Sequence, residues 1–365
     1  MGETDGLIRV KKRRKKSHKA AIIVLAVVVA LIVGAGAGFA LYVKSLDDSL
    51  SMDEQERSEL LDVLAPVVSN EQQAEPFYLL LIGSDAREGD TASRSDVTML
   101  VRVDTANALV DLVSIPRDMM VTINGSTQKI NAAYAEGGAS LAVQTVSEFA
   151  GVPISHYAEV DFASVEKLID DLGGVWVNVP ESFSAGNGGM DFEAGEQRLT
   201  GEQALAFARE RYHVSGGDFG RAQAQRMVVQ TVIQQVLAAQ PTQLPGLVSQ
   251  LAASVSTDLT VGDIISLAQD FQGSSAARTI YSAACPSYSM SVDGVSYVCP
   301  EFEEWRAMMQ RVDAGLDPND ESAEVPEEQR ANEALGAATN SPAPRDYAEL
   351  AASAGLTTDD VAAAN

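Results

Sequence analysis

The charged residues that could do chemistry lie in short motifs at the ends of apolar runs. R-S-D-V-T-M-L-V-R-V-D begins with Arg94 and Asp96, and A-L-V-D-L-V-S-I-P-R-D ends with Arg117 and Asp118. The apolar runs in both motifs are rich in β-branched residues, which predicts buried strands. We therefore expect the charged side chains at one edge of a sheet, where open α/β sheets usually bind ligands.

Two further arginines follow a predicted helix. Thr200 precedes Gln203 by three positions in T-G-E-Q-A-L-A-F-A, the spacing of a capping box, so a helix is expected over 200–208. The helix runs into A-R-E-R-Y. If the chain leaves it in extended form, Arg209 and Arg211 point the same way.

A long helix is predicted next, with Asp218 as its N-cap and an end near residue 239, before Pro241. Arg221 and Gln225 are four residues apart, so they share one face of this helix. That face lies near the positive end of the helix, which suits an anion.

The residue types favour phosphoryl transfer. Arginine forks neutralise phosphate oxygens and hard carboxylates hold Mg²⁺, while catalysis rests mainly on positioning and charge. Any one of these residues could instead form an ordinary surface ion pair, so the prediction rests on the whole group. The charged loop positions are Asp85, Arg87, Arg94, Asp96, Arg117, Asp118, Arg209, Arg211 and Arg221.

Other chemistries find less support. The three histidines, His18, His156 and His213, form no cluster with the spacing of zinc ligands. A Ser-His-Asp arrangement stays open, but the chain has no G-x-S-x-G elbow. It has no G-x-x-x-x-G-K-[ST] loop for nucleotide phosphates either.

The net charge of −25 is unevenly distributed. Residues 1–44 carry nine of the 26 Lys and Arg and two of the 51 Asp and Glu. The remainder is strongly acidic, which argues against nucleic-acid binding. Its basic residues are arginines except Lys129 and Lys167, a bias that fits local recognition of anions.

The N-terminus predicts a membrane anchor. A basic cytoplasmic tail, 1–19, precedes an uncharged apolar run of 24 residues, 20–43. As a helix this run would measure roughly 36 Å, enough to cross a bilayer core of about 30 Å. Because basic flanks stay inside, we expect a single-pass type II protein of the cell membrane with its C-terminal domain extracellular. A cleaved signal peptide is the alternative, but its apolar region is usually about 7 to 15 residues.

The rest of the chain is predicted to form an α/β domain over 76–310, after an extracytoplasmic stalk over 44–75. Strand and helix patterns alternate from Pro76 onward, which is typical of α/β folds. Predicted strands are F-Y-L-L-L-I-G, 156–160 and 175–179, and predicted helices are 139–150, 162–172 and segments within 247–271.

Two predictions concern the C-terminal part. Cys285 and Cys299 are the only cysteines, and outside the cytoplasm a disulfide between them is expected. Residues 311–365 are acidic and rich in Ala and Pro, so we expect a disordered tail.

Eight motifs, in order and after the predicted anchor, resemble the LytR-CpsA-Psr family. They are L-L-I-G-S-D-A-R, R-S-D-V-T-M-L, S-I-P-R-D, K-I-N-A-A-Y, V-D-F, L-G-G-V-W-V-N-V, L-T-G-E-Q-A-L-A-F-A-R-E-R and G-D-F-G-R-A-Q-A-Q-R, within 76–240. The resemblance implies an α/β/α sandwich with a central mixed β-sheet and a hydrophobic lipid tunnel. It also implies transfer of a glycopolymer from a polyprenyl-pyrophosphate carrier onto peptidoglycan, with Mg²⁺ or Mn²⁺ as cofactor.

The same resemblance assigns residues. Asp85 and Asp96 would hold the metal, and one of them would act as general base. Phe149, Phe162, Leu168 and Trp176 are candidate tunnel walls, although ordinary core positions are the alternative. Ala224 replaces a second arginine that the family often has on the long helix. The implied pyrophosphate ligands are Arg94, Arg117, Lys129, Arg209, Arg211, Arg221 and Gln225, with Asp85 and Asp96 beside them.

Two other functions stay open. The protein could hydrolyse the same pyrophosphate with water as acceptor. It could also be a non-catalytic, lipid-binding regulator of the envelope.

Overall fold

The computed structural model describes most of the chain beyond residue 51. The described residues are 44–45, 52–67, 69–70, 73–84, 95–186, 189–240, 246–247 and 255–345. The predicted cytoplasmic tail and membrane span, 1–43, lie outside them. Within the described part, we find no helix long and apolar enough to span a membrane. Contacts divide the chain into Met1–Leu46 and Asp47–Asn365, and the helices and strands from Glu54 onward belong to the second unit.

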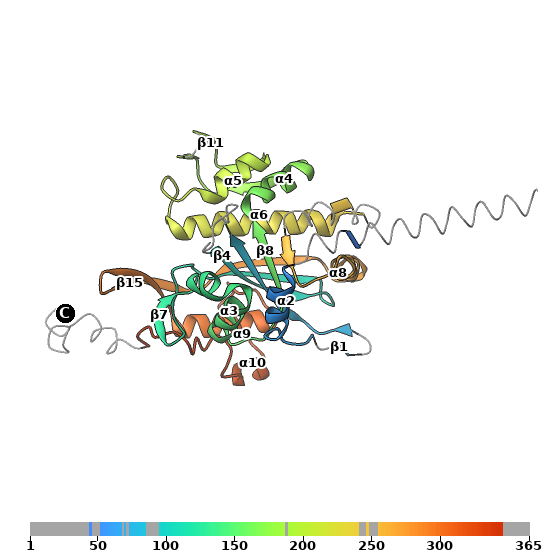
Figure 1. The fold of residues 1–365 in the computed structure, drawn as a ribbon. Coiled ribbons are helices and arrows are strands. Elements are labelled where there is room, and N and C mark those ends of the chain that lie inside the picture. The colour runs from blue at the N-terminus through green and yellow to red at the C-terminus, as the bar shows by residue number, and fades with distance from the viewer. Residues whose placement is uncertain are drawn as a thin grey trace, which may run out of the picture. The chain divides into compact units, whose positions relative to one another are not determined.

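Helices and strands alternate along this unit (Figure 1). The helices are α2 Glu54–Leu61, α3 Ala132–Ala150, α4 Phe162–Asp171, α5 Gly201–Arg209, α6 Asp218–Ala238, α8 Val261–Gly273, α9 Phe302–Asp313 and α10 Glu327–Ala331. The strands are β1 Ser69–Asn70, β2 Gln73–Ala74, β3 Phe77–Ser84, β4 Ser95–Asp104, β5 Leu109–Ser114, β6 Met120–Ile123, β7 Ser126–Lys129, β8 Ile154–Asp161, β9 Val175–Val179, β10 Phe183–Ser184, β11 Asp191–Phe192, β12 Gly195–Leu199, β13 Val255–Thr257, β14 Thr279–Ala284, β15 Ser287–Val292 and β16 Val295–Pro300.

A six-stranded mixed sheet forms the centre, in the order β13-β8-β3-β4-β5-β14. β3, β4 and β5 are antiparallel neighbours, while β8 runs parallel to β3 and β14 runs parallel to β5. Every residue of β5 is buried, as expected for a strand covered on both faces. Because β4 and β5 are antiparallel, the start of β4 and the end of β5 lie at the same edge of the sheet.

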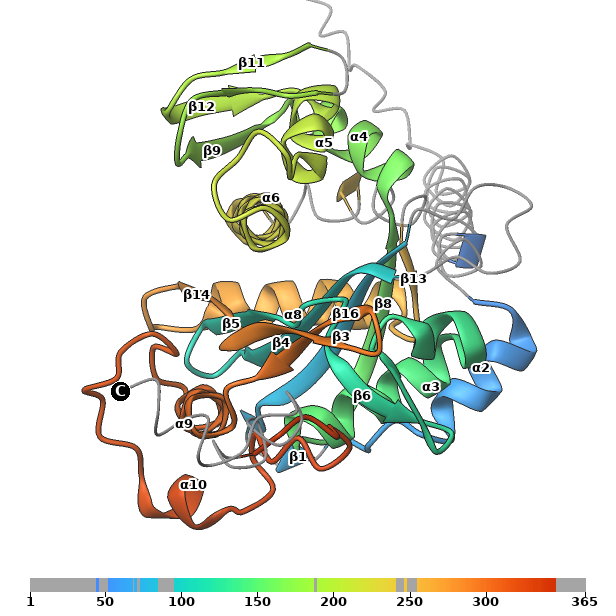
Figure 2. The same ribbon diagram turned by 90° about the vertical axis from the view of Figure 1, so that its left-hand side faces the viewer.

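Helices cover both faces of the sheet (Figure 2). Leu80, Ile82 and Leu100 pack in a cluster with residues of α3 and α9. Met99 and Val101, which alternate with Leu100 on β4, belong to the opposite cluster with residues of α6 and α8. This alternation along one strand buries both faces and confirms the predicted mixed sheet between helical layers.

A smaller body lies beyond α6 (Figures 1 and 2). Helices α4 and α5 and the β9–β12 hairpin share a separate apolar cluster that includes Val177, Phe183 and Phe207. At Gly201 an added Cβ would lie 2.0 Å from the carbonyl oxygen of Glu166, so α5 meets α4 at a point that has no room for a side chain. Phe207 and Ala208 of the same cluster hold the other end of α5, where Arg209 lies.

The predicted stalk, 44–75, is partly wrong. α2 packs on α3, and its Leu60 is fully buried in the main core. The backbone N–H of Ala65 also donates to the carbonyl of Ile154 at 2.8 Å. Leu60 is thus a core residue, Leu64 packs against the core, and the domain begins before residue 76.

The predicted disorder of 311–365 is wrong for residues up to 345, while 346–365 lie outside the described part. Leu335 and Ala338 are buried against the main core. The hydroxyl of Ser341 donates to the carbonyl of Met120 at 2.8 Å. The composition of this segment suggested disorder, but its few apolar residues pack against the main core of the domain.

The predicted disulfide is absent: Cys285 and Cys299 are buried free thiols. Cys285 follows the end of β14 and packs in the main core, whereas Cys299 lies on β16 in another cluster. Cys299 pairs with Tyr288 across the β15–β16 hairpin, and burial raises its pKa to about 11.

Candidate functional site: an arginine cluster at the sheet edge

The first pair of site residues lies at the common edge of β4 and β5. Asp96 is the second residue of β4, and Arg117 lies in the turn that follows β5. Nη1 of Arg117 donates to Oδ1 of Asp96 at 2.6 Å. Both side chains are partly exposed, so a ligand can reach them.

The first turn of α6 adds a second arginine. Oδ1 of Asp218 forms an ion pair with Nη2 of Arg221 at 2.6 Å and lies 3.9 Å from Nη2 of Arg117, so one carboxylate oxygen lies close to both guanidinium groups. Gly217 is the N-cap of α6, so the predicted cap at Asp218 was wrong by one residue. Burial lowers the pKa of Arg221, an effect opposed by Asp218 and Asp96 and reinforced by Arg117 and Arg211.

Two buried nitrogens at this point have no partner. Nε of Arg117 and Nε of Arg221 are both shielded from solvent and lack a hydrogen-bond acceptor. Buried donors are rarely left unpaired, because each costs about 1–3 kcal/mol. The cluster therefore has donors available for an anion.

Lys129 lies next to this cluster at the end of β7. Its Nζ is 3.0 Å from Oδ1 of Asp118. The negative charge of Asp118 also contributes to raising the pKa of Arg211. The backbone N–H of Asn131 donates to the carbonyl of Arg117 at 3.2 Å. The K-I-N segment is thereby held against the turn that carries Arg117.

Asn131 is a site residue that the sequence motifs did not single out. It is buried, and its Oδ1 has no hydrogen-bond partner. It occupies the N-cap position of α3 without capping it. The signal in the sequence was its place in K-I-N-A-A-Y, where only the lysine was predicted to bind a ligand.

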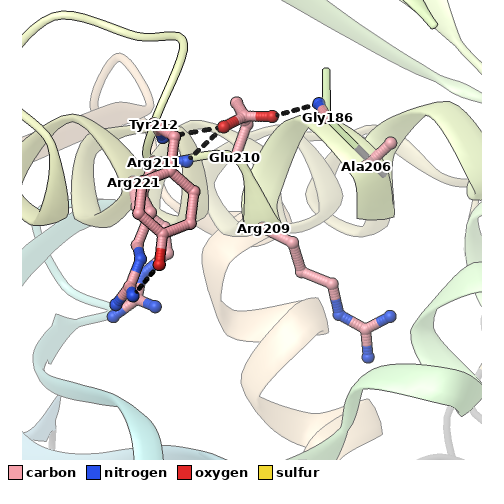
Figure 3. Close-up of a pocket in the computed structure, with 7 residues that line it drawn as sticks. All are labelled: Gly186, Ala206, Arg209, Glu210, Arg211, Tyr212 and Arg221. Atoms are coloured by element: carbon pink, nitrogen blue, oxygen red, sulfur yellow. Dashed lines mark hydrogen bonds between the residues drawn. The ribbon is translucent and has the colours of Figure 1, made fainter. Parts of the chain in front are cut away.

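The exit from α5 presents Arg209 and Arg211 to one pocket, as predicted. Glu210 between them is extended, with φ −71° and ψ 134°. Both arginines line a cavity of about 230 Å³ together with Tyr212 and Arg221 (Figure 3). The Arg211 guanidinium donates to the Tyr212 hydroxyl.

Glu210 holds this exit in place, a role that the sequence did not reveal. Its Oε1 accepts the backbone N–H groups of Arg211, Tyr212 and His213 at 2.9, 2.7 and 3.1 Å. Its Oε2 accepts the N–H of Gly186 at 2.7 Å (Figure 3). Burial raises the pKa of Glu210, but these hydrogen bonds outweigh it and lower the pKa to about 2. The carboxylate is thus ionised at all physiological pH values.

An apolar pocket adjoins the arginines. It holds about 60 Å³ between the sheet and helices α4, α5 and α6, and Gln225 is its one strongly polar side chain. The other lining residues are Leu81, Ile82, Gly83, Val97, Val160, Val165, Ile169, Ala204, Leu205, Ala208, Val228 and Val229.

Of the suggested tunnel walls, the three with described side chains do not line this pocket. Phe149 stacks on Trp305 in the core of the opposite face, and Leu168 is a buried residue of α4. Trp176 is 55% exposed on β9. The side chain of Phe162 lies outside the described part.

Asp85 and Arg94 also lie outside the described residues, so their predicted roles stay predictions. Asp96 is described, and one of its oxygens is engaged by Arg117. Within the described part, no three Asp, Glu, His or Cys side chains are grouped to hold a metal ion. Of the two predicted metal ligands, the structure describes Asp96 alone.

The structure thus combines a mixed sheet, an arginine cluster at the edge of that sheet and an apolar pocket lined by the sheet and helices α4, α5 and α6. The chain belongs to the LytR_cpsA_psr family, whose model matches residues 38–313. This finding confirms the family resemblance of the eight motifs.

Similar proteins carry related names. The chain is 34% identical over 290 residues to a polyisoprenyl-teichoic acid–peptidoglycan teichoic acid transferase, TagU, of Enterococcus faecalis, covering 77% of this chain and 91% of the relative. It is 32% identical to the TagU of Bacillus subtilis over 273 residues, 73% and 86% of the two chains.

Solved structures share the fold. The structure of B. subtilis TagV matches with a TM-score of 0.55 and 31% identity, covering 62% of this chain and 91% of that one. A structure titled TagT bound to LI-WTA matches with a TM-score of 0.54 and 25% identity, covering 68% and 92%.

Proposed function

We propose that this protein transfers a glycopolymer from a polyprenyl-pyrophosphate carrier onto peptidoglycan. The observation that carries the proposal is the placement of two residues on α6. Arg221 lines the polar pocket, and Gln225, one turn later, lines the apolar pocket. A pyrophosphate held by the arginines thus lies at the entrance to a lipid-compatible space. The names of the relatives support the same substrate class.

The residues divide the work of phosphoryl transfer. Arg117 and Arg221 neutralise the phosphate oxygens, and Arg209 and Arg211 approach from the α5 side of the pocket. A peptidoglycan hydroxyl attacks the phosphorus that bears the glycopolymer, and polyprenyl phosphate leaves with the electrons of the broken pyrophosphate bond. The product is a phosphodiester, and Asp85 or Asp96 accepts the hydroxyl proton. Donors preorganised for developing charge supply most of such catalysis.

Three parts of the proposal go beyond the described residues. The chain is anchored by residues 20–43 as a single-pass type II membrane protein, with its catalytic domain outside. A hydrophobic tunnel for the polyprenyl tail includes the apolar pocket, which by itself holds only about 60 Å³. Asp85 and Asp96 would hold Mg²⁺ or Mn²⁺, and the bound metal would polarise the pyrophosphate.

Product analysis tests the proposal. Full-length protein in detergent is incubated with a polyprenyl-pyrophosphate glycopolymer, with and without peptidoglycan fragments. Transfer predicts a phosphodiester-linked product that requires the fragments. Release of free glycopolymer phosphate at the same rate without fragments would instead establish the hydrolase. Binding without any product, in the presence of Mg²⁺, would establish the non-catalytic regulator.

A further inference from the structure

Tyr212 has an unusual environment for an exposed aromatic residue. Tyr212 is 77% exposed, yet its backbone N–H donates a hydrogen bond to the carboxylate of the buried Glu210. Its neighbours Arg211 and His213 are bonded to the same carboxylate oxygen. The backbone at Tyr212 is therefore held in place by Glu210, and the ring projects from it into solvent.

The ring itself is held from one side. Arg211 donates to the Tyr212 hydroxyl, and its guanidinium carbon lies 4.5 Å from the ring centroid. A cation over an aromatic ring is an attractive contact and leaves the opposite face of the ring uncovered. Tyr212 thus presents a flat apolar surface with a polar rim.

The ring also lies on a definite side of the arginines. Tyr212 lines the polar pocket with Arg209 and Arg221 (Figure 3), and it is not among the residues that line the apolar pocket. The two substituents of a pyrophosphate leave it in opposite directions. If the lipid lies toward Gln225, the other substituent lies on the Tyr212 side.

We propose that Tyr212 is a stacking platform for the first sugar of the glycopolymer, the one bonded to the pyrophosphate. This inference rests on the proposed function and names the residue that distinguishes a glycosylated carrier from a bare one. The apolar C–H face of a pyranose covers the free face of the ring, and its hydroxyl groups meet the polar rim. Tyrosine suits this contact because it offers a large rigid area with few rotatable bonds.

The test compares two lipids on the full-length protein in detergent. One is a short-chain polyprenyl pyrophosphate, and the other is the same lipid carrying one N-acetylhexosamine on its terminal phosphate. Tyr212→Ala should weaken binding of the sugar-bearing lipid by about fivefold to tenfold and leave the bare lipid unchanged. Tyr212→Phe keeps the ring and should retain most of the sugar preference.

Trp176→Ala is the matched control, since Trp176 is an exposed ring on β9 that does not line the polar pocket. It should change neither affinity. Equal losses for both lipids in Tyr212→Ala would overturn the platform, because they would show that Tyr212 acts through Arg211. Unchanged affinities for both lipids in Tyr212→Ala would overturn it as well. If the wild-type protein fails to bind even the bare lipid, the proposed function fails first, before any variant is compared.

Discussion

Arg117 and Asp96 are 21 positions apart in the chain, yet their side chains meet at 2.6 Å across the edge of β4 and β5. An ion pair this exposed adds only about 0–1 kcal/mol to stability. Its effect is to aim the guanidinium of Arg117 toward Asp218 and Arg221. The pair therefore matters for the site more than for the fold.

Arg117→Ala should lower turnover of the lipid-linked glycopolymer by about 100-fold, since it removes a preorganised cation at the developing charge. The melting temperature should shift by no more than about 2 °C. Arg330→Ala is the control, because Arg330 forms a similar 2.6 Å pair with Glu327 on α10. Wild-type turnover in Arg117→Ala would remove Arg117 from the mechanism.

Two threonines with the same capping role allow a second comparison. Thr200 caps α5 and Thr260 caps α8, each in a complete capping box. Thr200→Ala and Thr260→Ala should each cost about 1 kcal/mol in the free energy of unfolding. Only Thr200→Ala should reduce activity, because α5 carries Arg209. Chemical denaturation and turnover assays would measure both effects; equal activity losses would contradict the assignment.

Glu210→Gln should change the acid stability of the protein. The pKa of Glu210 is about 2 in the folded protein, below its usual 4.5, so its contribution is complete above pH 4.5 and is lost as the pH falls toward 2. At neutral pH the variant should be less stable by an amount on the order of 2 kcal/mol. The difference should shrink at lower pH in denaturation curves measured between pH 7 and 3. A constant difference over that range would argue against an ionised Glu210.

Asp111→Asn should change the pH dependence of stability in the opposite direction to Glu210→Gln. Asp111 is fully buried, and burial raises its pKa from 3.8 to about 7 despite Arg102 nearby. The folded protein binds this proton more tightly than the unfolded chain, so wild-type stability falls as the pH rises from about 4 to 7. Relative to wild type, Asp111→Asn should gain stability over that interval. Thermal melts at pH 4, 6 and 8 would measure the trend, and parallel curves would contradict it.

Gly151→Ala tests the packing of the C-terminal segment. Gly151 ends α3 with φ +68°, and a Cβ there would lie 1.6 Å from the carbonyl oxygen of Ala334. Gly294 has φ +80°, and a Cβ there would meet no atom within 4 Å, so Gly294→Ala is the matched control. The control should cost about 1 kcal/mol in the free energy of unfolding from backbone strain alone, and Gly151→Ala clearly more. Equal costs would show that residues 314–345 do not pack against α3.

Much of the fold could be predicted from the sequence, because its local signals agree with the tertiary structure. The capping box at Thr200 and the apolar, β-branched runs of β4 and β9 were sufficient to predict these elements. The predictions were wrong where contacts between residues far apart in the sequence determine the structure. Leu60 is buried by α3, which follows it by more than 70 residues, and Leu335 is buried by the same core from the other end of the chain.

The site was predictable in its residue types but not in its supports. Arginine and aspartate at strand ends pointed to Arg117 and Asp96. Glu210 was missed because its role is to accept hydrogen bonds from backbone N–H groups. These hydrogen bonds form only because the chain leaves α5 in extended form. Asn131 was missed because an unpaired buried oxygen cannot be recognised without a three-dimensional structure.

The hydrogen bond from Ser341 to Met120 joins residues 221 positions apart. During synthesis the strand β6 therefore waits for nearly the whole chain before its last partner arrives. Contacts of such long sequence separation slow folding and leave apolar surface open to aggregation in the meantime. A protein shortened before residue 335 would keep every arginine of the site and yet be released with part of its core uncovered.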